Sequence, residues 1–84
     1  MKKLLPRITA EKRKGIETLL EFCIRKYKSN QSPVGKRLWY ERKEFLAELQ
    51  KKQSYDTKDR DGYNEIRRIY ILDRKMNNIN IKND

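Results

Sequence analysis

The chain has 84 residues, 40% of them charged and 36% apolar, and its 22 lysines and arginines against 12 acids give a formal charge of +10. This length leaves room for one thin hydrophobic core, and no apolar run approaches the roughly 20 residues that a membrane-spanning helix needs. One cysteine excludes an intramolecular disulfide, and the lack of histidine argues against zinc, so we expect no metal, no cofactor, no membrane contact and a cytoplasmic location.

Residues 1–8 form a basic N-terminal arm, in which Pro6 favours an extended backbone for the residue before it. A first helix is predicted from its N-cap Thr9 to about Lys28. Apolar residues at helical spacing define its buried face: Ile16, Leu19, Leu20, Cys23, Ile24 and Tyr27. Because Cys23 belongs to this face, we interpret it as a small buried hydrophobic residue and not as a nucleophile.

A second helix is predicted after the polar break at residues 29–33, running to about Gln53. Ser32 before Pro33 is a helix-start signal, since proline at the first helical position loses no needed donor. Gly35 leaves an extended loop up to residue 36 as the alternative start. The predicted apolar face, along which the stem of one arginine lies, comprises Leu38, Trp39, Arg42, Phe45, Leu46 and Leu49.

The third element follows a predicted polar loop at residues 54–62. Asp56 or Asp61 is the expected cap of a helix that continues to about residue 76. The β-branched and aromatic residues Ile69–Leu72 also fit a short strand. We favour the helix because a single strand would have no partner elsewhere in the chain.

Together these elements predict a mainly α fold, a small three-helix domain at residues 9–76 followed by a polar, flexible tail at residues 77–84. The core is expected to depend on a few large side chains: Phe22, Tyr27, Trp39, Tyr40, Phe45, Tyr63 and Tyr70. The long amphipathic first helix would also suit a homo-oligomer.

The positive charge lies mainly before residue 55. Residues 1–30 carry nine bases and three acids, residues 31–54 six and three, and residues 55–84 seven and six. Such a field attracts polyanions, and nucleic acid is the commonest of these inside a cell. The charge pattern therefore predicts a small basic protein that binds DNA or RNA and contacts its phosphate backbone through the N-terminal arm and the start of the second helix.

Two groups of residues are the predicted contacts. Lysine and arginine would neutralise backbone phosphates, a tyrosine would stack on an exposed base, and the amides at the start of the second helix would meet a phosphate. The simpler interpretation is a solvated helix face, because three glutamates on the second helix dilute its charge. The predicted nucleic-acid-binding residues are Lys12, Arg13, Lys14, Lys36, Arg37, Tyr40 and Lys43.

A third basic group lies near the end of the chain, where four bases stand close in sequence to four acids. We expect these bases to form ion pairs within the domain and not to bind a ligand. The bases are Arg67, Arg68, Arg74 and Lys75, and the acids are Asp59, Asp61, Glu65 and Asp73.

No catalytic signature is present. Gly35-Lys36 lacks the earlier glycine and the following Ser or Thr of a phosphate-binding loop, and a partial calcium loop ending at Arg68 has a cation where a carboxylate is required. Without histidine the commonest general base is missing, so we do not expect an enzyme. The alternative function is a protein-binding adaptor or inhibitor that docks on an acidic surface of a larger enzyme or nucleoprotein complex.

Overall fold

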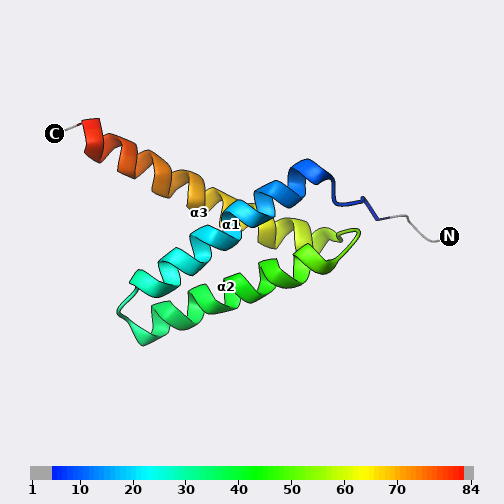
Figure 1. The fold of residues 1–84 in the computed structure, drawn as a ribbon, viewed down its shortest axis with the longest axis horizontal. Helices are drawn as coiled ribbons and strands as arrows, with labels where there is room; N and C mark the ends of the chain where they lie inside the picture. The colour runs from blue at the N-terminus through cyan, green and yellow to red at the C-terminus, as the bar shows by residue number, and fades with distance from the viewer. Residues whose placement is uncertain (1–4, 83–84) are drawn as a thin grey trace.

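The computed structural model describes the backbone of residues 5–82 and the side chains of residues 5–76. Three helices follow one another: α1 (Ala10–Ser29), α2 (Pro33–Lys51) and α3 (Thr57–Lys82). α1 and α2 form an antiparallel hairpin, which α3 crosses before its C-terminal half projects away (Figure 1). The prediction of a mainly α, three-helix domain is confirmed, and the strand alternative for Ile69–Leu72 is wrong because these residues lie inside α3.

The first two helices begin where their capping residues predict. The Thr9 hydroxyl accepts a hydrogen bond from the Lys12 amide at 3.1 Å, and the Ser32 hydroxyl accepts one from the Gly35 amide at 3.4 Å. α2 starts at Pro33, so the extended alternative up to residue 36 is wrong.

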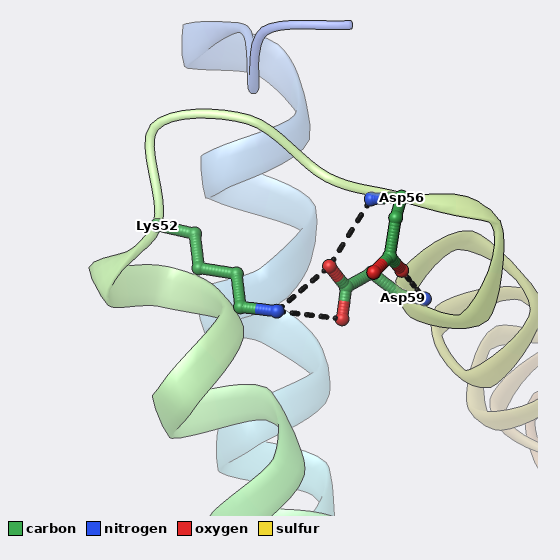
Figure 2. A network of polar contacts seen from close by, with 3 residues as sticks. All are labelled: Lys52, Asp56 and Asp59. Atoms are coloured by element: carbon green, nitrogen blue, oxygen red, sulfur yellow. Dashed lines mark hydrogen bonds and ion pairs between the residues drawn. The ribbon is translucent and has the colours of Figure 1, made fainter. Parts of the chain in front are cut away.

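α3 begins at the earlier of the two predicted caps, because Asp56 and Asp59 cap it reciprocally. The Asp59 amide donates to Asp56 Oδ1 at 2.8 Å, and the Asp56 amide donates to Asp59 Oδ2 at 3.2 Å. Lys52 Nζ, at the end of α2, donates to both oxygens of the buried Asp59 carboxylate at 3.0 and 2.9 Å (Figure 2). The predicted loop is therefore helical from Thr57, and the cap is Asp56 and not Asp61.

This network sets the protonation of its two charged members. Burial by itself raises the pKa of Asp59, but the hydrogen bonds from Lys52 and from the Asp56 amide outweigh it and hold the pKa below its usual value. The hydrogen bond to Asp59 raises the pKa of Lys52 in turn. Both side chains are therefore charged at neutral pH, and the ion pair joins the end of α2 to the first turn of α3.

The core lies where α3 crosses the hairpin. Its buried residues come from all three helices and from the segment before α1: Ile8, Ile16, Leu19, Cys23, Leu46, Leu49, Tyr63 and Ile66. Trp39, Phe45 and Tyr70 pack against it. Leu38, Ile24, Tyr27 and Tyr40 are exposed, contrary to their predicted place in the core, because α1 and α2 extend past the region that α3 covers.

Phe22 is fully buried and joins the three helices. Its ring makes edge-to-face contacts with Trp39 at 5.3 Å and with Tyr70 at 5.1 Å between centroids. One turn further along α1, Lys26 Nζ lies 2.9 Å from the Asp73 carboxylate of α3.

Cys23, next to Phe22 in the chain, is fully buried, and burial raises the pKa of its thiol to about 11, so the thiol stays protonated.

The segment before α1 pairs with the link between α2 and α3. The Ile8 amide donates to the Gln53 carbonyl at 2.9 Å, the Tyr55 amide donates to the Pro6 carbonyl at 3.0 Å, and Arg7 and Ser54 form an antiparallel bridge. Residues 6–8 of the predicted arm are thus held against the domain, whereas residues 1–4 lie outside the described part of the chain.

The predicted flexible tail falls largely outside the described part of the chain. The α3 backbone continues to Lys82, the side chains of residues 77–82 are not described, and residues 83–84 lie beyond the described backbone. The flexibility of residues 77–84 stays a prediction.

Two glycines allow the helices to approach closely at their crossings. A Cβ on Gly62 would lie 2.5 Å from Cζ and 2.9 Å from Cε2 of the Phe45 ring, which belongs to α2. A Cβ on Gly15 would meet the hydroxyl of Tyr63, which belongs to α3. The absence of a side chain at both positions therefore permits the packing of α3 on the hairpin.

Candidate nucleic-acid interface

The two groups of predicted contact residues lie on separate parts of the α1–α2 hairpin. Lys12, Arg13 and Lys14 belong to the first turns of α1, whereas the other group begins near the start of α2, beside the last turns of α1, and reaches the middle of α2 at Lys43. At about 1.5 Å per residue, the helix places the first and last turns of α1 about 20 Å apart. The structure therefore does not bring the two groups together into one surface.

Most of the first group is engaged within the domain. The Arg13 guanidinium donates to the carbonyls of Gln50 at 2.7 Å and Lys52 at 2.8 Å, which satisfies acceptors at the end of α2. Lys12 Nζ lies over the rings of Tyr55 and Tyr63, 4.4 and 5.2 Å from their centroids. Lys14 is exposed, so it is the member of this group that is positioned to meet a ligand.

The second group forms a compact cluster with Tyr27, which the sequence placed in the core. The Tyr27 and Tyr40 ring centroids are 6.0 Å apart. Lys36 Nζ lies 4.9 Å from the Tyr27 centroid and donates to the Tyr27 carbonyl at 3.0 Å, while Lys43 Nζ lies 4.8 Å from the Tyr40 centroid. We call Tyr27, Lys36, Tyr40 and Lys43 the tyrosine–lysine cluster.

Both rings of the cluster are open to solvent, with Tyr27 37% and Tyr40 44% exposed. The Tyr40 hydroxyl donates to Glu44 at 3.0 Å, and this hydrogen bond raises the pKa of Tyr40, so the ring stays neutral at physiological pH. Helical spacing placed Tyr27 on the apolar stripe of α1, so no signal in the sequence pointed to its exposure.

The field around the cluster is strongly positive, since residues 25–43 hold seven bases and one acid. Two of these bases serve the fold: Lys26 pairs with Asp73, and the Arg42 guanidinium lies 4.5 Å from the Trp39 centroid. Arg37 is 3.8 Å from Glu41 in an exposed pair that water and salt weaken. Lys28, Arg37 and the two cluster lysines therefore supply most of the available charge.

The start of α2 adds little to anion binding through its backbone. The Ser32 amide donates to Asn30 Oδ1 at 3.0 Å, the Gly35 amide to the Ser32 hydroxyl, and the Lys36 amide to the Ser32 carbonyl. These donors are already satisfied, so side-chain cations and not backbone amides would meet a phosphate here.

The basic group on α3 does not form the predicted ion pairs within the described residues. Asp59 and Asp73 pair instead with Lys52 and Lys26 on the other two helices. The prediction failed because both acids point toward the hairpin, whereas the arginines follow one another on other faces of α3. Within the described side chains, Arg67, Arg68 and Lys75 take part in no ion pair, and Arg74 donates to the Tyr70 hydroxyl at 3.4 Å.

Neither a metal site nor a membrane span is evident in the described part of the chain. No group of three or more Cys, Asp or Glu side chains there could hold a metal ion, and none of the helices is long and apolar enough to cross a bilayer. No family model, curated protein or solved structure matches the chain.

Proposed function

We propose that the protein binds nucleic acid through its phosphate backbone, at the tyrosine–lysine cluster and the neighbouring cations Lys28 and Arg37. The observation that supports this function is the cluster itself, in which two exposed rings each hold a lysine ammonium within about 5 Å. Aromatic rings interleaved with bases are typical of surfaces that bind nucleic acid without reading its sequence.

Phosphate contact would supply most of the affinity. Each lysine that neutralises a phosphate releases condensed counterions, so binding weakens as salt increases. The ammonium groups of Lys36 and Lys43 rest on rings at the surface, from which they can turn toward a phosphate without leaving the cluster. Tyr27 and Tyr40 would then be free to stack on unpaired bases, which favours single strands over duplex.

A salt titration of two matched variants tests this proposal. Fluorescence anisotropy would follow a labelled single-stranded DNA, a single-stranded RNA and a duplex, with K36Q/K43Q compared with K51Q/K58Q. Lys51 and Lys58 are exposed and lie at the other end of the hairpin, so the control removes the same charge outside the cluster.

We expect K36Q/K43Q to weaken single-strand binding about tenfold at low salt and to reduce the slope of log Kd against log salt by about 1.4, since each single-strand phosphate contact contributes about 0.7. The control should change affinity by less than about twofold. Circular dichroism checks that loss of the Lys36 hydrogen bond to Tyr27 leaves the helices intact. The absence of binding to any nucleic acid at low salt, or equal effects of the two variants, would contradict the proposal.

The first predicted group remains a proposed second contact. Lys14 is exposed about 20 Å from the cluster. A strand that extends along α1 would reach both ends of the hairpin. In the same titration, K14Q should then weaken binding of a long strand and leave a short strand unaffected.

A further inference from the structure

The face of α3 that points away from the core combines bases and apolar side chains. Its residues follow the spacing i, i+3, i+4, i+7 and i+8, which places them along one stripe of a helix. The core-facing stripe of the same helix contains Tyr63, Ile66 and Tyr70. We call the opposite stripe the α3 outer face, and it comprises Asn64, Arg67, Arg68, Ile71, Leu72 and Lys75, which together line a shallow groove.

Apolar surface on this face is unusually open. Ile71 is 36% exposed and Leu72 54%, and Met76, one turn beyond Leu72, is 65% exposed. Figure 1 shows the C-terminal half of α3 projecting from the hairpin, and the outer face is turned away from the side on which Tyr70 and Asp73 meet α1. Exposed apolar residues that gather on one helix face, and are not scattered singly, are typical of an interaction site.

The charge on this part of the helix is almost entirely positive. Between residues 66 and 76 there are four bases and one acid, Asp73, whose carboxylate lies 2.9 Å from Lys26 of α1. Two further acids, Asp61 and Glu65, belong to the first turns of α3, before the apolar residues begin. A partner that covers Ile71 and Leu72 would therefore meet guanidinium and ammonium groups on both sides.

We propose that the α3 outer face binds an acidic, amphipathic helical segment of another protein. Apolar side chains of such a segment would cover Ile71 and Leu72, and its carboxylates would meet Arg68 and Lys75. A second copy of this chain is a poor occupant, because it carries the same sign of charge and a total of +10. A nucleic-acid backbone would satisfy the bases but would leave the leucine and isoleucine without apolar contact.

The test uses two peptide probes of identical composition. In one peptide, leucines and glutamates are arranged to form separate helical faces, and in the other the same residues are scrambled. Anisotropy measures binding of each to the intact protein, to R68E/K75E, to I71Q/L72Q and to the charge-matched control K51E/K58E. The substituted side chains on α3 are exposed, and thermal melts verify that each variant folds.

We expect the patterned peptide to bind and the scrambled peptide not to bind, with affinity about tenfold weaker in both α3 variants and unchanged in the control. No binding of the patterned peptide, equal binding of the two peptides, or full affinity in I71Q/L72Q would overturn the proposal. Vesicles of anionic phospholipid and a single-stranded oligonucleotide are measured in parallel. If either binds and loses affinity in both α3 variants, the face belongs to that ligand and the proposal is again overturned. Variants at Lys36 and Lys43 separate this result from the proposed nucleic-acid site.

Discussion

Replacement of Gly62 by alanine sets two physical effects of opposite sign against each other. In the interior of a helix, alanine is favoured over glycine by about 1 kcal/mol, so the substitution alone would stabilise α3. The new methyl group, however, would lie 2.5, 2.9 and 3.1 Å from three atoms of the Phe45 ring. Ordinary carbon contacts lie at about 3.5–4.0 Å, so the ring or the helix must move by about 1 Å.

The steric effect should dominate. Phe45 is a rigid ring that packs against the core, and overpacking of this kind costs about 1–3 kcal/mol. When the gain in helix propensity is subtracted from this overpacking cost, the net loss in the free energy of unfolding is about 1 kcal/mol. For a domain of this size, such a loss lowers the melting temperature by about 4–8 °C.

Urea denaturation and thermal melts of G62A, F45L and the double variant measure both effects. Leucine removes the ring atoms that the methyl group meets, so in the F45L background the alanine should stabilise the protein by up to about 1 kcal/mol. The sign of the alanine effect therefore reverses between the two backgrounds. A G62A protein more stable than the parent, or the same effect in both backgrounds, would refute the close approach of α2 and α3 at this position.

Three further measurements test other parts of the structure. The pKa of Asp59 is lowered in the folded state, so its contribution to stability is present above the usual carboxylate range near pH 4 and is lost as the pH falls through the folded-state pKa. D59N should therefore be less stable than the parent at neutral pH. Its free energy of unfolding should also vary less with pH in acid. The thiol of Cys23 should react with a disulfide reagent only as fast as the domain opens, so labelling should accelerate with urea, and rapid labelling in buffer would contradict its burial. Y40L should weaken single-strand binding severalfold and leave duplex binding nearly unchanged, and equal losses for both would argue against stacking.

The local signals in the sequence predicted the helices well. Thr9 and Ser32 hydrogen-bond the amides that their positions predict, and Pro33 begins α2. The sequence leaves the start of α3 open between Asp56 and Asp61, because the polar residues around them suit a loop as well as a helix. The local reciprocal cap of Asp56 and Asp59 sets the observed start, and the ion pair of Asp59 with Lys52, a contact between two helices that no local pattern encodes, adds to it.

The candidate site was only partly predictable, because contacts between helices decide which of its residues are available. Lys36, Tyr40 and Lys43 do gather on one side of α2, as helical spacing suggested. Arg13 looked equally available in the sequence, but its acceptors are backbone carbonyls of residues 50 and 52, and carbonyls carry no sequence signal. Tyr27 continued the apolar stripe of α1, and its exposure became visible only with the position at which α3 crosses the hairpin.

The bridge between Arg7 and Ser54 has a consequence for the order in which the chain folds. These residues are separated by more than half of the sequence, whereas the α1–α2 hairpin is closed by a short turn. Contacts that close short loops form first, so the hairpin can assemble during synthesis. Residues 6–8 can pair only after residues 53–55 have left the ribosome. The cover that Ile8 provides for the core can therefore form only in a chain that has been synthesised past the end of α2.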